Sequence, residues 1–518
     1  MKRRHFIQTA GKAVTLPILL NGMKLSAMSR SAIFKGVNND SDRVLILIQL
    51  NGGNDGLNMV IPRDQYSGLS NVRPNILIPE TAVLPLNDLV GVHPVMTGVK
   101  TLFEEGKLGI VQAAGYPNQN RSHFRSTDIW TSGSPAEQFW TTGWLGRYMD
   151  GLYPGFPDNY PNDEYPDPFA ITMGNVVSET CQGVSANFSL TLNDPFNLLS
   201  LYEGEPGELP DTPYGEELSF LRTAIAQSNA YSQVVETAAT AGANLVEYPA
   251  DNRLAQQLKN VALLISGGLR TKVYVVSLGG FDTHANQVDT GDPTAGDHAQ
   301  LLETLSQAMA VFQADLMAQG IEEKVVGMTF SEFGRRIRSN DSLGTDHGTA
   351  APLMVFGSCV NAQVLGENPE IPTDVDVQEG IPMQYDFRDI YGSILMDWFE
   401  VPEEDVKSLL HEGFTHLPIL EVCSPVSTAN PVVSEEIRLT SFPNPFREST
   451  IIEFYSKGEQ ARLSIFNSMG AELEVLVDKK LPEGVHQVEY RPKDLPAGNY
   501  YYRLQLDGRF RTRRFVKM

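Results

Sequence analysis

Short apolar runs alternate with segments of helical period over most of the chain, from Val44 to about Leu417. Five runs are nearly continuous in apolar residues, as in strands buried on both faces: Val44–Leu50, Leu108–Ala114, Val273–Leu278, Lys324–Phe330 and Leu353–Phe356. Helix-period segments lie between them at Met96–Phe103, Leu254–Ile265 and Leu301–Leu316, with Asp297 expected to cap the last. This order predicts an α/β fold with a doubly wound, mostly parallel sheet.

The pattern changes near Val422. Residues 424–437 are expected to be a linker, because the stretch from Ser424 to Ser434 is rich in Pro, Ser, Val and Thr. Short alternating stretches follow, with turn signals between them. They lie at Thr450–Tyr455, Ala461–Phe466, Leu473–Val477, His486–Tyr490 and Asn499–Leu506. We therefore expect an α/β domain over residues 30–423 and a small all-β sandwich over residues 438–518.

The first residues resemble an export signal. Arg3 and Arg4 precede a modest apolar stretch from Ala13 to Leu20, which suggests a twin-arginine signal over residues 1–29; an ordinary secretory signal is the alternative. Pro17 and the short length argue against a bilayer span, and no other segment is apolar for long enough. We expect a chain without a transmembrane segment in its mature form, exported through the periplasm and then secreted or attached to the cell surface.

Composition narrows the function. A net charge of -23 argues against a nucleic-acid partner, which needs a basic surface. The three cysteines, Cys181, Cys359 and Cys423, are too few and too widely spaced for a disulfide-stapled fold, although one bridge is left open. The 518 residues favour two or more domains.

Three glycine-containing turns hold acidic and imidazole side chains. The first two follow apolar runs, and ligands gather beyond the carboxyl ends of parallel strands. Asp282 and His284 are two residues apart, so an extended backbone would place both on one face. Asp346 and His347 are adjacent, so a turn is expected to bring them together. Asp55 is a weaker candidate, because Asn-Asp-Gly is common in ordinary turns. Carboxylates and imidazoles together predict one or two divalent ions, Zn²⁺ or Ca²⁺.

Two further segments lie at the same predicted edge. Ser122 is expected at a helix start, either as a nucleophile or as a simple cap. Arg121 or Arg125 is a candidate anion clamp, and His123 is a ligand or a hydrogen-bonding neighbour. After the Lys324–Phe330 run, Glu332 is a candidate carboxylate ligand, and an ion pair with Arg335 or Arg336 is its alternative.

These segments resemble, in order, the family called domain of unknown function 1501. The resemblance rests on Asn51–Asn58, Arg121–Phe124, Gly280–His284, Ser331–Arg335 and Gly344–Gly348. That family is similar to the alkaline phosphatase and sulfatase superfamily, which implies Asp55 as the first-strand ligand and Ser122 as the nucleophile. It also implies Asp282 with His284, and Asp346 with His347, as later ligand pairs. The last superfamily histidine is left open among His298, His411 and His416.

The C-terminal segment resembles the sorting domain of the type IX secretion system. The matching pieces are Phe442–Phe446, Leu463–Gly470, Leu495–Leu504 and a basic end. The resemblance implies passage across the outer membrane, with the twin-arginine and type IX translocons as partners.

Two functions remain open from the sequence. The first is a secreted, metal-dependent hydrolase of phosphate or sulfate esters, in which Ser122 or a metal-bound water attacks and Arg121 and Arg335 hold the anion. An anionic ester or glycan would then be the substrate. The second is a non-catalytic secreted or surface binding protein that keeps the hydrolase fold, in which the Tyr-rich segment from Tyr148 to Asp167 would bind the partner.

Overall fold

The computed structural model describes residues 42–197, 228–421 and 439–517, apart from a few short gaps in the last range. The chain divides into two compact units, Met1–Val426 and Ser427–Met518, and the division falls within the expected linker. The expected signal at residues 1–29, that linker and Cys423 lie outside the described residues. Among the described residues, no helix is both long and apolar enough to cross a bilayer.

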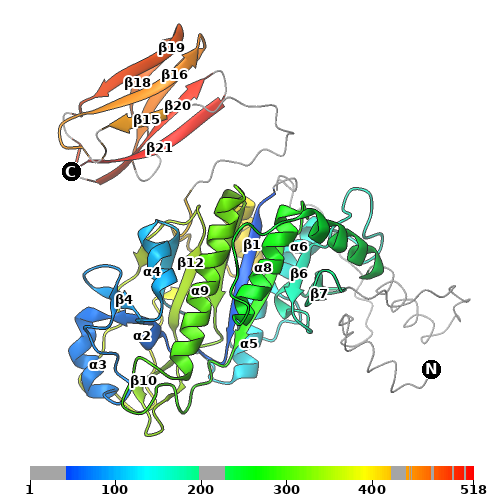
Figure 1. Cartoon of the computed structure of the whole chain (residues 1–518), viewed down its shortest axis with the longest axis vertical. Helices are drawn as coiled ribbons and strands as arrows, with labels where there is room; N and C mark the ends of the chain where they lie inside the picture. The colour runs from blue at the N-terminus through cyan, green and yellow to red at the C-terminus, as the bar shows by residue number, and fades with distance from the viewer. Residues whose placement is uncertain are drawn as a thin grey trace, which may run out of the picture. The chain divides into compact units, whose positions relative to one another are not determined.

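A nine-stranded sheet forms the centre of the first unit (Figure 1), in the order β13-β5-β12-β9-β1-β8-β6-β7, with β14 also paired to β5. Its strands are β1 (Val44–Asn51), β5 (Leu108–Gly115), β6 (Ala170–Met173), β7 (Ser189–Leu192), β8 (Val273–Gly279), β9 (Val325–Phe330), β12 (Ala351–Phe356), β13 (Val364–Leu365) and β14 (Tyr385–Asp386). Every pairing is parallel except those of β12, which runs against β5 and β9. The predicted mostly parallel α/β fold is confirmed.

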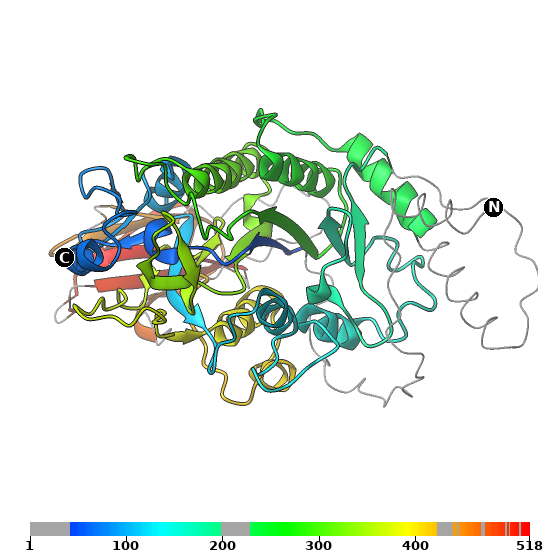
Figure 2. The same cartoon turned by 90° about the horizontal axis from the view of Figure 1, so that it is seen from below.

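Helices cover both faces of the sheet, as Figure 2 shows. Alternate residues of β1 point to opposite sides, since Ile46 and Ile48 belong to one buried cluster and Leu45 and Leu47 to the other. The first cluster packs under α4 (Thr97–Glu104), α8 (Arg253–Ser266) and α9 (Asp297–Ala318). The second packs under α5 (His123–Ser132), α6 (Trp144–Leu152), α10 (Phe387–Phe399) and α11 (Glu403–Leu409).

Helix ends follow local side-chain chemistry in one case and not in another. Asn252 caps α8, because its side chain accepts a hydrogen bond from the Ala255 amide at 2.9 Å. The expected cap Asp297 is instead the first residue of α9, and Gly296 is the cap residue. A carboxylate in the first turn still interacts favourably with the positive end of the helix.

Smaller elements surround the carboxyl edge of the sheet. A hairpin joins β10 and β11, and a three-stranded sheet has the order β2-β4-β3. The other elements described in this unit are α2 (Gly56–Met59), β2 (Val60–Pro62), α3 (Tyr66–Val72), β3 (Leu84–Pro85), β4 (Val90–Val92), β10 (Arg335–Ser339), β11 (Thr345–His347), a helix over residues 228–241, and three 3-10 helices, η1 (Arg63–Gln65), η2 (Glu179–Cys181) and η3 (Glu322–Lys324).

The second unit consists of two antiparallel sheets, β15-β16-β19 and β18-β17-β20-β21. Its strands are β15 (Leu439–Phe442), β16 (Thr450–Lys457), β17 (Gln460–Phe466), β18 (Glu472–Lys480), β19 (Glu483–Tyr490), β20 (Gly498–Leu506) and β21 (Arg509–Lys517). Ile452, Leu463 and Phe515 lie in its buried core. The predicted all-β C-terminal region is confirmed, and it contains two strands more than the alternation indicated, β15 and β21.

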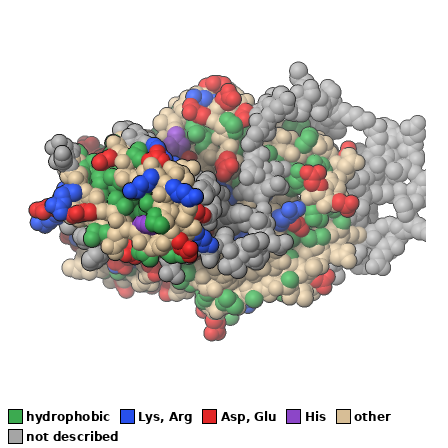
Figure 3. Space-filling view, turned by 90° about the horizontal axis from the view of Figure 1, so that it is seen from above, with side chains coloured by type: hydrophobic (Ala, Val, Ile, Leu, Met, Phe, Trp, Pro, Cys, Tyr) green, Lys and Arg blue, Asp and Glu red, His purple; other side chains and the backbone are tan. Residues whose placement is uncertain are grey.

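Figure 3 shows acidic side chains at several separate places on the visible face of the protein.

Candidate metal centre

Three loops meet at the carboxyl ends of β9, β1 and β8, which are neighbours in the sheet. Arg335 ties these loops together. Its guanidinium donates to the carbonyl oxygens of Gly53 at 2.6 Å and Thr345 at 2.7 Å, and to Asp282 Oδ1 at 2.6 Å. It also reaches the carbonyls of Gly52 and Phe281. The sequence had suggested that Arg335 clamps an anion. Because its side chain is only 1% exposed and is used in these five hydrogen bonds, Arg335 instead holds the loops in place.

The loop after β1 lies directly against the loop after β8. Gly52 has a φ of +124°, and a Cβ atom there would lie 2.3 Å from the Asp282 amide nitrogen. A residue with a side chain would therefore be strained and would push the Asp282 loop away.

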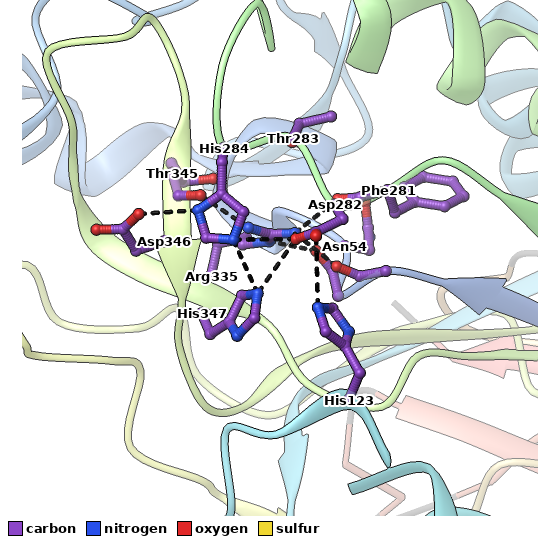
Figure 4. A network of polar contacts seen from close by, with 12 residues as sticks. Asn54, His123, Phe281, Asp282, Thr283, His284, Arg335, Thr345, Asp346 and His347 are labelled. Atoms are coloured by element: carbon purple, nitrogen blue, oxygen red, sulfur yellow. Dashed lines mark hydrogen bonds and ion pairs between the residues drawn. The ribbon is translucent and has the colours of Figure 1, made fainter.

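One carboxylate and three imidazoles converge in front of these loops (Figure 4). Asp282 Oδ1 lies 3.1 Å from Nε2 of His284 and 3.1 Å from Nε2 of His347. Asp282 Oδ2 lies 3.5 Å from Nε2 of His123. The two Nε2 atoms of His284 and His347 are 2.9 Å apart. Thus Asp282 and His284 do share one site, as their spacing predicted.

The opposite nitrogen of each imidazole faces an oxygen that can only accept a hydrogen bond. Nδ1 of His347 lies 2.9 Å from the Arg121 carbonyl. The corresponding partner is Asp346 Oδ1 for His284 and Glu332 Oε1 for His123, both at 2.9 Å. A neutral imidazole bound in this way carries its proton on Nδ1 and presents a lone pair at Nε2.

This arrangement fits a divalent cation. Two Nε2 lone pairs that face each other across 2.9 Å repel one another unless a proton or a cation lies close to both. Ligand atoms of His123, Asp282 and His347 all lie within 4.8 Å of one another. Two imidazoles and a carboxylate, with the rings oriented by oxygen acceptors, are a common ligand set of zinc-type sites. His284 lies beside this group and contacts Asp282 and His347, but it is not among the three residues whose ligand atoms all lie this close.

The pKa shifts of Asp282 and His347 favour the protonation states that bind a metal. Partial burial alone would raise the pKa of Asp282, but the hydrogen bond and charge of Arg335, together with His347, hold it below its usual value. Burial lowers the pKa of His347, against the opposing effect of Asp282. An ionised carboxylate and a neutral imidazole are the states that coordinate a metal.

Asp55 does not join this cluster. Its carboxylate is 1% exposed and forms a buried ion pair with Arg73, whose Nη1 lies 2.9 Å from Oδ2. Gln287 Nε2 donates to the same oxygen at 2.6 Å. The expectation that Asp55 faces the metal with the other candidates is therefore corrected, because an arginine and an amide already satisfy its charge.

Asp346 and Glu332 serve the cluster from behind. Asp346 and His347 lie in strand β11 and so point to opposite sides, which corrects the expected turn. Asp346 binds His284 and, through Oδ2, Arg336 at 3.0 Å. Partial burial would raise its pKa, but these two partners hold it below the ordinary value. Each carboxylate thus orients an imidazole through its Nδ1 atom, on the side of the ring opposite Nε2.

Glu332 is 4% exposed and makes two bonds through Oε1. It accepts from the Gly52 amide at 2.8 Å as well as from His123. Neither alternative partner, Arg335 or Arg336, forms an ion pair with it among the described residues.

Ser122 precedes α5 as its cap residue, but its side chain makes no capping hydrogen bond. The simple capping interpretation is therefore wrong, and Ser122 is exposed. Arg125 is directed away from the site, since its guanidinium bonds the carbonyls of Pro135 and Ala136. Arg125 is thus not the anion clamp. Arg121 contacts the cluster through its backbone carbonyl, which lies 2.9 Å from His347 Nδ1, and its guanidinium donates to the Gln378 carbonyl.

The three further histidine candidates all lie outside the cluster. His298 is buried against Asn54, while His411 and His416 pair with Asp389 and Asp397. His123, from the start of α5, is the third imidazole instead.

The residues behind the cluster could not be recognised from the sequence. Gln287 accepts hydrogen bonds from Thr283 at 3.1 Å and Thr345 at 2.7 Å, and so joins the two loops that bear the ligands. Neither Gln287 nor Arg73 lies in a recognisable motif, so only the tertiary contacts identify them.

The fold and the cluster define an α/β protein with a candidate metal centre at the carboxyl edge of its sheet. Residues 92–395 match the model of the family described as "Protein of unknown function (DUF1501)". The chain belongs to this family. A comparison with curated proteins gives no match.

Several solved structures align over most of the chain. A protein of the alkaline phosphatase superfamily from Vibrio parahaemolyticus is 9% identical, with 84% of this chain and 82% of that chain covered and a TM-score of 0.30. A sulfatase from Pseudoalteromonas sp. is 9% identical, with 86% and 83% covered and a TM-score of 0.29. A phosphonate monoester hydrolase of Agrobacterium radiobacter is 12% identical, with 87% and 89% covered and a TM-score of 0.26. At these scores no residue role is transferred from them.

Proposed function

We propose that this protein is a metal-dependent hydrolase of phosphate or sulfate esters. The observation that supports it is the convergence of three Nε2 lone pairs on Asp282, each fixed by an oxygen acceptor behind its ring. Such a site is open on one side, because the Asp282 side chain is 47% exposed. An accessible metal is what hydrolysis of an ester requires.

One Zn²⁺, or a similar ion, suits the site better than Ca²⁺. Imidazole nitrogens outnumber carboxylate oxygens among the donors, whereas Ca²⁺ requires oxygen ligands. The second carboxylate expected near the ion, Asp55, is neutralised by Arg73, so we propose a single ion. When bound, such an ion polarises an ester oxygen and lowers the pKa of a coordinated hydroxyl or water.

Ser122 is the proposed nucleophile. Its hydroxyl is not used in capping, and it lies at the N-terminus of α5, where unpaired amides and the helix dipole stabilise negative charge. The neighbouring His123 Nδ1 is held by Glu332, so His123 is fixed in orientation rather than free to rotate.

Metal analysis tests the site first. Protein purified without chelator should contain about one zinc-like ion per chain, and His347→Ala should lose it. His416→Ala is the matched control, because His416 pairs with Asp397 outside the cluster. Wild-type protein that binds no divalent ion when these are supplied would contradict the proposal.

Activity tests the nucleophile. Ser122→Ala should lower turnover of aryl phosphate or aryl sulfate by several powers of ten while the metal content stays unchanged. Full turnover by Ser122→Ala would exclude Ser122 as the nucleophile. No turnover of either ester by the metal-loaded wild type would favour the binding protein.

The non-catalytic alternative has less support from the Tyr-rich segment. Tyr153 and Phe156 in that segment are buried and not displayed. Tyr153 stacks on Phe169 with ring centroids 3.6 Å apart, and Phe156 stacks on Phe188. These rings form a local core and leave little aromatic surface for a partner.

We also propose export by the twin-arginine and type IX routes, as the two ends of the sequence suggest. Cys359 is disulfide-bonded and Cys181 is a free, buried thiol. A disulfide supports an oxidising compartment. Replacing Arg3 and Arg4 by lysine should retain the protein in the cytoplasm, and removing residues 438–518 should retain it in the periplasm; unchanged fractionation of either variant would contradict that step.

A further inference from the structure

The aromatic ring of Phe333 lies against two imidazoles of the cluster. Its centroid is 4.9 Å from that of His123 and 4.7 Å from that of His347, and the ring planes are tilted by 43° and 36°. The two imidazoles are 4.3 Å apart and meet edge to face. Rings at such separations are in direct contact, so each of these three rings touches the other two.

His123 and His347 are the imidazoles whose ligand atoms lie within 4.8 Å of Asp282 and of each other. Behind the cluster, Nδ1 of each ring is held by an oxygen at 2.9 Å, a carboxylate in one case and a backbone carbonyl in the other. A hydrogen bond at one ring atom still lets the ring tilt about that bond. Contact with the ring face opposes this tilt, so Phe333 supplies a restraint that the hydrogen bonds lack.

Phe333 is itself fixed in place. The residue is 1% exposed, so the ring is enclosed by protein. Gly53 has a φ of +79°, and a Cβ atom there would lie 2.2 Å from Cε2 of Phe333. The backbone after β1 therefore packs on the edge of the ring, and a larger residue at position 53 would displace it.

Phe333 contributes no ligand atom, and its effect on an ion must act through the two imidazoles. Rings in contact leave no room for water between them, so Phe333 keeps water from one side of both imidazoles. The Asp282 side chain is 47% exposed, and solvent reaches the cluster there. A rigid apolar residue against the ligands both fixes their orientation and controls the polarity around the ion.

We propose that Phe333 is a positioning residue of the candidate metal centre, which sets the tilt of His123 and His347 so that both Nε2 atoms reach the ion that Asp282 binds. This inference rests on the metal centre of the proposed function and does not depend on which ester is cleaved. A smaller or more flexible apolar side chain at position 333 would fill the space but would not hold the two rings.

Zinc affinity and the visible spectrum of the Co²⁺-loaded protein test this role. Competition with a chelator should show about tenfold weaker zinc binding by Phe333→Leu than by wild type. The absorption bands of Co²⁺ in the same site should change in position and intensity, because they report the geometry of the ligands. Phe333→Met fills the space with a flexible chain and should change both measurements in the same direction, which provides the test if Phe333→Leu folds poorly.

Phe330→Leu is the matched control. Phe330 is 3% exposed, ends β9 in the same segment, and stacks on Trp130 with ring centroids 6.3 Å apart. The control should lose a similar amount of stability in urea titrations, because a buried phenyl ring is replaced in both proteins. It should keep the zinc affinity and the cobalt spectrum of wild type.

Wild-type zinc affinity and spectrum in both Phe333 variants would overturn the inference and leave the metal centre in place. Equal losses of affinity in Phe330→Leu and Phe333→Leu would also overturn it, because a general loosening of the packing would then suffice. A wild type that binds zinc but cleaves neither ester, with weaker binding in the Phe333 variants, would refute the hydrolase and support the role of Phe333. A wild type that takes up no metal would overturn both.

Discussion

The loops after β1 and β8 resemble each other in sequence, but their aspartates lie in different environments. Each follows a buried parallel strand, contains glycine and carries an aspartate, Asp55 in one and Asp282 in the other. Asp55 is 1% exposed and paired with Arg73 and Gln287, whereas the Asp282 side chain is 47% exposed and faces three imidazoles. One aspartate is part of the core, and the other is available to a metal.

The difference shows what position at a strand end does and does not specify. This position brings a carboxylate to the carboxyl edge of the sheet, where ligands gather. The side chains that other elements bring to it then decide its role. A buried charge must be paired, and Arg73, directly after α3, supplies the pair for Asp55. Arg335 reaches Asp282 with one donor only and leaves its other oxygen toward His123.

Breaking the buried pair should have the largest effect on stability. Arg73→Met leaves the Asp55 carboxylate buried without its cation, and should lower the free energy of unfolding by about 3–5 kcal/mol in urea titrations. Asp282→Asn is the comparison: it removes a half-exposed charge that pairs with the buried Arg335, but the amide oxygen can still accept from the guanidinium, so the loss should be smaller, about 1.5–3 kcal/mol. Equal losses for both variants would remove the distinction between the two loops.

The second-largest effect is expected at acid pH, where the buried His298 should lower the free energy of unfolding. Burial lowers the pKa of His298 to about 4, so this imidazole stays neutral in the folded state while the unfolded chain takes up a proton below about pH 6.5. Protons therefore favour unfolding, and stability falls as pH drops from 6.5 toward 4.

His298→Gln removes this sensitivity. Between pH 7 and pH 5, wild type should lose about 2 kcal/mol more stability than the variant, measured by urea unfolding at each pH. The pKa of His93 is lowered to about 3, first by burial and then by the nearby His298. His93 titrates in both proteins, and its burial, the larger cause, persists in the variant, so most of its contribution is shared. Parallel pH profiles for the two proteins would show that His298 is not held neutral.

A smaller effect is expected when a carboxylate behind an imidazole loses its charge. Glu332→Gln keeps an oxygen that can accept from His123 Nδ1 but removes the charge that makes the ring a stronger ligand. Zinc affinity, measured by competition with a chelator, should fall about tenfold. Glu303→Gln is the control, since Glu303 is an exposed residue of α9 whose side chain accepts a hydrogen bond from Gln307, away from the cluster. An unchanged affinity in Glu332→Gln would place His123 outside the metal site.

The smallest effect on stability is expected at Ser122, the residue that precedes α5. Ser122→Ala should change the free energy of unfolding by less than about 0.5 kcal/mol, because no capping bond is lost. Asn252→Ala, which loses the cap of α8, should cost about 1 kcal/mol in the same urea titration. A loss in Ser122→Ala as large as in Asn252→Ala would return Ser122 to a capping role.

The sequence determined the strands and the residue types at their ends. Continuous apolar runs have few alternatives to a buried strand, so the five strands were located to within a few residues. The period of two also placed Asp282 and His284 correctly in one site. The single reversed strand, β12, could not be recognised, since an apolar run carries no information on its direction.

Only the tertiary structure decided which charged side chains meet. Asp55 with Arg73, Glu332 with His123 and Asp346 with His284 are all contacts between segments far apart in the chain. Spacing along a sequence is informative over a few residues, because backbone geometry then fixes relative direction. Over longer separations the partner of a charge depends on how whole elements pack, and that packing separates the carboxylates behind the site from the one that faces it.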